Sequence, residues 1–309
     1  MIIYNIDTID FIFEDIDEEY LVFFNTFFSK KTYAKGEEQV IIRKVQGLDM
    51  PQDSKITYGI NSIFAEKERE CIIYISSYEH DIALKNEINF SKVEIEWTRS
   101  CDKKRINNYL KNIVLYYITK NNEKNGWIKL HASCVYNKNL NKALIFMGNS
   151  GSGKSTVSAE LCKFDQMFFV SDDVIFLSFL GNECICKSTG FPPLQYTRPN
   201  QYISFEDDKK VEKYVDKEWN KTVSGSYKVG GVFLLSLYNS KDIVIRRIET
   251  FQDAIKCFNS NVLIEQNNMQ NKLLICNLIN YLLEKNIIYD LKLSINSRNF
   301  FKINDFIGL

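Results

Sequence analysis

The stretch FMGNSGSGKSTVSAEL, from Phe146 to Leu161, decides the fold class of this chain. It contains the pattern G-x-x-x-x-G-K-[ST], in which a glycine-rich loop between a strand and a helix surrounds the phosphates of a nucleotide. The apolar run Ala143 to Met147 precedes the loop with the length of a buried strand, and Thr156 to Lys163 follows it as the expected helix. A Gly/Ser-rich turn that matches by chance would not explain both flanks. The sequence therefore predicts a phosphate cradle in an α/β domain.

Each part of the cradle has an expected role. The amides from Ser150 to Ser155 line it, Lys154 reaches the β and γ phosphates, and the Ser155 hydroxyl binds Mg²⁺. We expect ATP and Mg²⁺ as the nucleotide and the metal, with GTP left open. The predicted nucleotide-binding residues are Gly148, Asn149, Ser150, Gly151, Ser152, Gly153, Lys154, Ser155 and Thr156.

Asp172 and Asp173 directly follow a second apolar run, Met167 to Val170. Phosphoryl transfer needs one carboxylate for Mg²⁺ and usually another that accepts the proton of the attacking hydroxyl. Adjacent residues at a strand end point in different directions, so one aspartate can face the metal and the other the acceptor. The alternative is a polar turn in which one aspartate caps its neighbours. We predict that both are catalytic and, with Ser155, bind the metal, and leave open which is the base.

Two further candidates are His131 and Arg198. His131 is one of two histidines and falls in a predicted strand, Trp127 to Tyr136, that pairs with the strand entering the loop. Its imidazole either contacts the γ-phosphate or is a hydrogen-bonded core histidine. Arg198 lies in the proline-rich segment Phe191 to Tyr202. Its guanidinium matches phosphate oxygens, although a plain surface arginine is the alternative.

Composition narrows the class of partner. Lys plus Arg and Asp plus Glu both number 39 among 309 residues, so no net charge favours nucleic acid or an anionic membrane. The chain opens on an acidic, aromatic segment and lacks an apolar run of membrane-spanning length, so we expect a cytoplasmic protein. The eight cysteines include no CxxC pair. Most are expected to be buried thiols, although Cys184 and Cys186, on one face of a strand, could bind a soft metal.

The chain is expected to contain two domains, a smaller N-terminal α+β domain over residues 1–125 and a nucleotide-binding domain over residues 126–309. The polar stretch KNNEKNG, from Lys120 to Gly126, marks the boundary. The first domain, which could dock a substrate, has a predicted helix over residues 104–119. Its predicted strands lie in IIYNI, YLVFF, QVIIRKV, CIIYISS and KVEIEW. Seven acids among its first 19 residues form either a solvated edge or a docking face for a basic partner.

The second domain continues with a predicted hairpin around Gly181 and Asn182. Strands are expected at residues 229–238 and 242–248, and helices at residues 252–258 and 267–284.

The order LHASCVY, LIFMGNSGSGKST and FFVSDDV resembles the nucleotide-binding domain of HPr kinase and its relatives, whose fold phosphoenolpyruvate carboxykinases share. The resemblance covers roughly residues 126–260, including VGGVFLLSL and FQDAIKCF. It implies a P-loop domain with a mixed sheet. It also implies a site of His131, Lys154, Ser155, Asp172 and Asp173, with an aspartate as general base toward a serine hydroxyl.

The segment after the aspartates reads FPPLQYTRPN, where HPr kinases proper carry a long Gly-rich signature. The whole chain is more similar to the HPr-kinase-like enzymes that modify ribosomally made peptides, including lasso peptide kinases. This implies an ATP-dependent kinase acting on a serine of a peptide or protein. A nucleotide-binding regulatory module without transfer, and a small-molecule kinase or nucleotide hydrolase of the same fold, remain alternatives. The oligomeric state, a homo-oligomer included, stays open.

Overall fold

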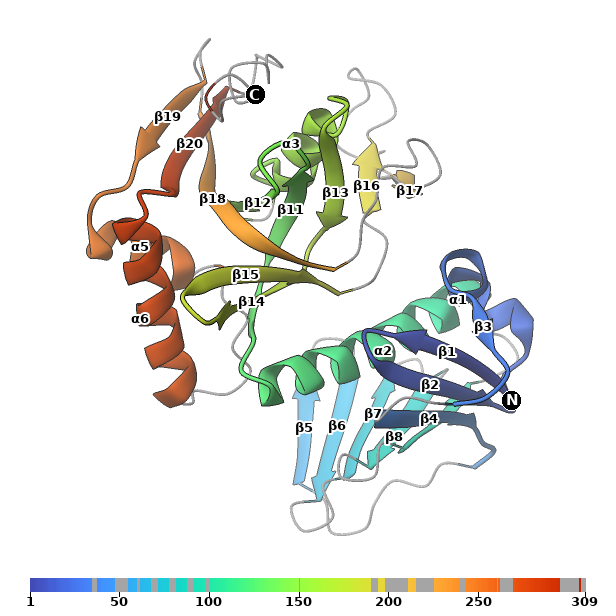
Figure 1. The fold of residues 1–309 in the computed structure, drawn as a ribbon. Helices are drawn as coiled ribbons and strands as arrows, with labels where there is room; N and C mark the ends of the chain where they lie inside the picture. The colour runs from blue at the N-terminus through green and yellow to red at the C-terminus, as the bar shows by residue number, and fades with distance from the viewer. Residues whose placement is uncertain are drawn as a thin grey trace. The chain divides into compact units, whose positions relative to one another are not determined.

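The structure is a computed structural model in which the chain divides into two compact units, Met1–Lys120 and Asn121–Leu309 (Figure 1). It describes residues 1–34, 38–47, 55–59, 62–67, 72–77, 82–87, 92–97, 101–149, 151–189, 194–197, 211–214, 225–238, 243–259, 261, 269–294 and 306. Each unit contains a large mixed sheet together with helices, so the chain is of mixed α/β type.

The first unit contains a nine-stranded sheet in the order β3-β1-β2-β4-β9-β8-β7-β6-β5. Its strands are β1 (Ile2–Ile6), β2 (Ile9–Glu14), β3 (Lys30–Lys31), β4 (Glu38–Lys44), β5 (Lys55–Gly59), β6 (Ser62–Lys67), β7 (Ile72–Ser77), β8 (Ile82–Glu87) and β9 (Lys92–Trp97). Strand β4 runs parallel to both of its neighbours, β2 and β9. The other neighbours are antiparallel. Four of the five predicted strands therefore lie in this sheet.

The fifth predicted strand, YLVFF, is wrong, because this segment is helical. A short 3-10 turn (Glu18–Tyr20) leads into α1 (Val22–Phe27). The helix buries Phe24, whose ring lies 5.7 Å from that of Tyr4 and 5.0 Å from that of Phe13. A short, continuous apolar run fits a buried helix as well as a buried strand.

The long helix α2 (Lys103–Lys124) contains the predicted helix and continues through most of the polar stretch KNNEKNG. It ends where Gly126, with φ 78°, adopts a left-handed conformation. The Gly126 N–H then donates to Glu123 O at 3.0 Å and the Trp127 N–H to Asn122 O at 3.0 Å. These bonds satisfy carbonyls at the helix end, as in a Schellman motif. The glycine, and not the polar composition, therefore stops the helix.

Several acids of the N-terminal segment are paired within the first unit. Glu18 accepts from Lys30 Nζ at 2.7 Å, Glu19 accepts from Lys103 Nζ at 2.6 Å, and Glu14 pairs with Arg43. Since these carboxylates already have cationic partners, the acidic segment presents less net negative charge than its sequence suggests.

The sheet of the second unit follows the order β10-β14-β15-β18-β12-β11-β13, and β20 joins it beside β18. Its strands are β10 (Ile128–Leu130), β11 (Ala132–Asn137), β12 (Lys142–Met147), β13 (Met167–Ser171), β14 (Ile175–Leu180), β15 (Glu183–Ser188), β18 (Ser226–Tyr238), β19 (Val244–Arg247) and β20 (Ile288–Ser294). Strands β12 and β20 each run parallel to β18. A separate pair is formed by β16 (Leu194–Thr197) and β17 (Val211–Tyr214).

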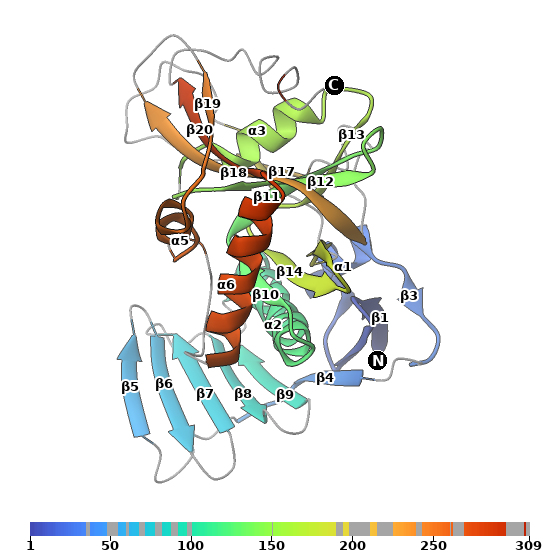
Figure 2. The same ribbon diagram turned by 60° about the vertical axis from the view of Figure 1, so that its left-hand side comes forward.

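The helices described in this unit are α3 (Lys154–Leu161), α5 (Phe251–Asn259) and α6 (Met269–Glu284) (Figure 2). Strand β12 separates two cores, because its side chains alternate between the faces of the sheet. Ile145 and Met147 pack with residues of α5 and α6, whereas Leu144 and Phe146 pack with residues of α3. Among the described helices, none is long and apolar enough to cross a membrane.

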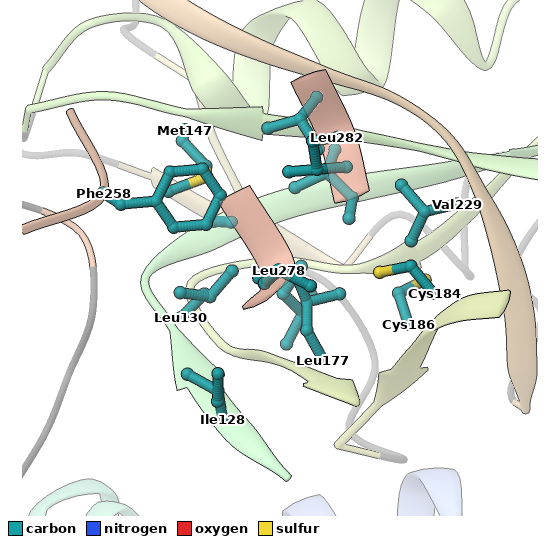
Figure 3. Close-up of a cluster of buried hydrophobic side chains, with 14 of the residues drawn as sticks. Ile128, Leu130, Met147, Leu177, Cys184, Cys186, Val229, Phe258, Leu278 and Leu282 are labelled. Carbon is teal, nitrogen blue, oxygen red and sulfur yellow. The ribbon is translucent and has the colours of Figure 1, made fainter. Parts of the chain in front are cut away.

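Figure 3 shows the first of these cores, which contains Met147 of β12 and Phe258 of α5, both completely buried. Cys184 and Cys186 line the same core. Burial raises the pKa of the Cys184 thiol, and the Cys186 sulfur lies 3.7 Å from that of Cys134. Of the described cysteines, all but the partly buried Cys276 are buried free thiols, as predicted for most of them.

The predicted strand Trp127 to Tyr136 is in fact two strands with a break at His131. Strand β10 pairs with β14, whereas β11 pairs with β12 and β13. The predicted pairing of β11 with the strand entering the glycine-rich motif is confirmed. Its last pair is Ala132 with Met147, which places His131 and Gly148 just beyond the end of the ladder.

Candidate active site

The glycine loop, residues 148–153, connects the end of β12 to α3, which begins at Lys154 (Figure 1). The strand and the helix that the motif requires are therefore both present. Gly148, Gly151 and Gly153 have φ of 153°, 80° and 95°. Residues with a side chain rarely adopt such values, so the backbone of the loop depends on its glycines. Ser150 lies outside the described residues.

Gly148 is the tightest point of the loop. A Cβ at this position would lie 2.5 Å from the carbonyl oxygen of Leu235 in β18 and 2.7 Å from Ser152 Oγ. Ser152 is buried, and its hydroxyl has no hydrogen-bond partner among the described residues. Its N–H donates to Asn149 O at 3.1 Å. The loop thus begins in direct contact with β18 and has no room for a side chain there.

Lys154 lies over the glycine loop. Its side chain is only 6% exposed, and Nζ donates to Gly148 O at 2.8 Å and to Asn149 O at 3.2 Å. Burial lowers the pKa of Lys154, although the negative charges of Asp173 and Asp172 act in the opposite direction. The ammonium group is therefore positioned at the loop, within the electrostatic influence of two carboxylates.

Asp172 faces the start of α3. The Ser155 hydroxyl donates to Asp172 Oδ1 at 2.9 Å, while Asp172 Oδ2 is buried without a hydrogen-bond partner among the described residues. Burial, reinforced by the charge of Asp173, raises the pKa of Asp172 to about 7. Hydrogen bonds from Ser155, the Asp173 backbone and Ser133 oppose the shift. A buried oxygen with an open lone pair next to a hydroxyl is a ready acceptor for a cation.

Ser133 lies beneath this pair, in β11. Its hydroxyl is within 2.7 Å of the Ser158 hydroxyl of α3, and both serines are fully buried. The position follows from strand alternation within β11, which places Ser133 on the same face as Val135, the face that packs with residues of α3. The buried polar atoms around Asp172 therefore come from β11, from α3 and from the end of β13.

Asp173 points the other way, toward the His131 side of the site. Its Oδ1 lies 3.7 Å from His131 Nε2, and the two side chains are 60% and 31% exposed. Asp173 has a φ of 64°, a left-handed conformation that aspartate tolerates better than most residues. The turn thus directs one carboxylate inward and the next outward, as the sequence predicted for the pair.

Asn261, just after α5, joins the two sides of the site. Its backbone carbonyl accepts from the His131 N–H at 2.7 Å, and its side-chain Oδ1 accepts from the Gly148 N–H at 3.0 Å. Asn261 is 2% exposed. The sequence offered no sign of this residue, because it lies far from the motif in the chain and outside any recognisable pattern.

The remaining predicted residues are less informative. Asn149, in the loop, and Thr156, in the first turn of α3, are exposed. Arg198 lies outside the described residues, so its predicted contact with phosphate stays a prediction. Ser133 was not predicted, although its place in the strand that pairs with the strand entering the loop is a signal that could have identified it.

Known proteins resemble this chain only weakly. No protein-family model matches the chain, and no curated protein matches it. Among solved structures, the chain is similar to the Hpr(Ser) kinase/phosphatase from Coxiella burnetii, with 18% sequence identity and a TM-score of 0.27. The match covers 51% of this chain and 97% of that chain.

The donor atoms at the loop fit the preferences of Mg²⁺. No three side chains of His, Cys, Asp or Glu form a metal-binding group within the described part of the chain. Mg²⁺ in nucleotide sites, however, is usually held by one or two protein oxygens together with phosphates and waters. The Ser155 hydroxyl and the Asp172 carboxylate are hard oxygen donors of this kind, and they already contact each other.

Proposed function

We propose that this protein is an ATP-dependent kinase that transfers a phosphoryl group to a serine hydroxyl of a peptide or protein. The observation that carries the proposal is the meeting of two groups of residues at one end of β12. Lys154, Ser155 and Asp172 lie at the glycine loop, and His131 with Asp173 lies next to them. A site for phosphoryl transfer needs both a phosphate-binding side and an acceptor side.

On the phosphate-binding side, the loop amides and Lys154 hold the phosphates of ATP. Lys154 would exchange its two carbonyl acceptors for phosphate oxygens, which are stronger partners because they are charged. Ser155 and Asp172 would hold Mg²⁺, which neutralises developing charge on the phosphates. The inward direction of Asp172, toward Ser155, is the reason for giving it this role.

On the acceptor side, Asp173 serves as the general base. Its exposed carboxylate can be reached by a hydroxyl on a large substrate. His131, whose Nε2 lies 3.7 Å from Asp173 Oδ1, can interact with the negative charge of that carboxylate. The serine oxygen forms a bond to the γ-phosphorus, the bond from that phosphorus to the ADP oxygen breaks, and the serine proton passes to Asp173. His131 assists without carrying the proton, so its loss slows the reaction less than the loss of Asp173.

The choice of a peptide or protein as acceptor, in particular a ribosomally made precursor peptide, rests on the resemblance of the sequence motifs. A direct test is to incubate the protein with ATP and Mg²⁺ in the presence of serine-containing peptides, and separately with small alcohols. We expect ATP consumption to require a peptide, and peptide mass to increase by one phosphate. ATP hydrolysis at the same rate with and without every acceptor, and with no phosphorylated product, would indicate a hydrolase. Nucleotide binding without consumption would indicate a regulatory module.

A further inference from the structure

Asn261 makes three backbone-directed hydrogen bonds that together are called the Asn261 clamp here. Its N–H donates to Phe258 O at 2.9 Å, its carbonyl accepts from the His131 N–H, and its side-chain Oδ1 accepts from the Gly148 N–H. A buried amide side chain is stable only when it is hydrogen-bonded, and Asn261 is 2% exposed. The clamp therefore has a defined geometry.

The clamp lies just beyond the last paired residues of β11 and β12. The ladder between β11 and β12 ends at the pair Ala132 and Met147. His131 and Gly148 come next, one at the break between β10 and β11 and the other at the start of the glycine loop. Asn261 accepts a hydrogen bond from the N–H of both His131 and Gly148. It therefore links two segments that are no longer paired as strands.

The clamp is also fixed to the core. Phe258, which accepts from the Asn261 N–H, is completely buried in the same core as Met147 (Figure 3). Packed interiors resist displacement, so a residue bonded to this point moves little relative to the end of β12.

From this arrangement we infer that Asn261 is a positioning residue that sets the glycine loop and His131 relative to each other. This inference rests on the proposed function for its catalytic consequence: the loop carries the phosphates, and His131 stands beside the base. A displacement of about 1 Å between reacting groups can lower a rate by roughly a hundredfold. The structural part of the inference, the link from Gly148 to His131, does not depend on that function.

Asn137 provides a matched control. It is also a fully buried asparagine, and its Oδ1 accepts from the N–H groups of Asn139 and Leu140 at 2.9 and 3.1 Å. It is the last residue of β11, just before the turn to β12. Asn137→Ala and Asn261→Ala thus remove the same kind of bond, but only the second acts at the site.

The test combines hydrogen exchange with kinetics on the full chain. In Asn261→Ala, exchange of the Gly148 amide should become about tenfold faster, because one net hydrogen bond is lost. The kcat for phosphoryl transfer from ATP to a serine-containing peptide should fall by roughly ten- to a hundredfold. Asn261→Asp, which keeps an acceptor oxygen at the same reach, should restore the protection of Gly148. Asn137→Ala should lower the melting temperature without changing either readout.

Equal Gly148 exchange in Asn261→Ala and in Asn137→Ala would overturn the inference. So would an unchanged kcat in Asn261→Ala when the wild-type protein transfers phosphate. If the wild-type protein transfers none, the proposed function fails by itself, and the exchange of Gly148 still decides whether the clamp holds the loop.

Discussion

Two adjacent carboxylates, Asp172 and Asp173, have unlike surroundings, and this difference is what allows them separate roles. Asp172 is bonded to Ser155 and has a buried Oδ2, whereas Asp173 is exposed beside His131. Neighbouring titratable groups in contrasting environments can take different roles in catalysis. The surroundings of each aspartate thus assign metal binding to Asp172 and proton acceptance to Asp173.

The raised pKa of Asp172 predicts a pH dependence of Mg²⁺-nucleotide binding. A carboxylate must be ionised to bind the metal, and the pKa of Asp172 is raised to about 7. Affinity for Mg-ATP should therefore rise as pH increases through about 7 in the free protein. Titration calorimetry between pH 5.5 and about 8.5 measures it. Asp172→Asn should bind weakly at every pH, and a wild-type affinity that does not change across this range would contradict the role.

The same shift predicts how Asp172 affects stability. Its pKa rises from 3.8 when unfolded to about 7 when folded, so between these values the folded protein binds a proton that the unfolded chain does not. The free energy of unfolding contributed by this residue therefore falls as pH rises through that window. Asp172→Asn should be more stable than the wild type at about pH 8, by roughly 1 to 3 kcal/mol, and should lose that advantage near pH 4. Denaturant unfolding at both pH values checks this, and a variant that is less stable at about pH 8 would refute it.

Gly148 permits a prediction based on space. In Gly148→Ala, the new Cβ would meet the Leu235 carbonyl oxygen at 2.5 Å. We expect a loss of about 1 to 3 kcal/mol in unfolding free energy and the loss of ATP binding. Gly181→Ala is the control, because Gly181 also has a positive φ of 61° but has no atom within 4 Å of an added Cβ. If both variants bind ATP equally, the loop does not need the close contact with β18.

At the scale of elements, one buried hydrogen bond joins β11 to α3. It links the hydroxyls of Ser133 and Ser158, which are both fully buried. Removing one hydroxyl leaves the other without this partner, which costs about 1 to 3 kcal/mol, whereas removing both is milder. Ser133→Ala with Ser158→Ala should therefore cost less than the sum of the two single changes. A double-mutant cycle of unfolding free energies measures this, and strict additivity would show that the two hydroxyls are not coupled.

Elements with strong local signals could be predicted from the sequence. The hairpin of β14 and β15 turns at Gly181 and Asn182 as expected, with Leu180 paired to Glu183. The strand and helix around the glycine loop are also where the motif places them. In these cases the turn residues and the apolar spacing agree with the tertiary fold.

Other elements depend on information that a local pattern does not contain. YLVFF forms part of a helix whose Phe24 packs on Tyr4 and Phe13, and the run itself does not indicate these contacts. The break at His131 arises because β10 and β11 pair with different partners. Asn261 enters the site through tertiary contacts alone. Long-range pairing, not propensity, decides each of these features.

At the scale of the whole molecule, we expect the proposed reaction to run in one direction. HPr kinases that also catalyse the reverse reaction need inorganic phosphate to attack phosphoserine, and their associated Gly-rich segment has no counterpart after Asp173 in this sequence. We therefore expect phosphopeptide product to remain intact when Mg²⁺ and excess phosphate are added. Peptide mass and pyrophosphate are the readouts, with a bifunctional HPr kinase as the positive control. Rapid loss of phosphate with release of pyrophosphate would place this protein among the bifunctional enzymes.

The most direct test of the central claim follows labelled γ-phosphate from ATP to a peptide serine. We expect label on the peptide with the wild-type protein, none when the serine is replaced by alanine, and a decrease of roughly a hundredfold or more in Lys154→Ala and Asp173→Asn. Glu160→Gln, which changes a carboxylate on the surface of α3, should transfer label at the wild-type rate. Transfer that is undiminished in both Lys154→Ala and Asp173→Asn would contradict the account.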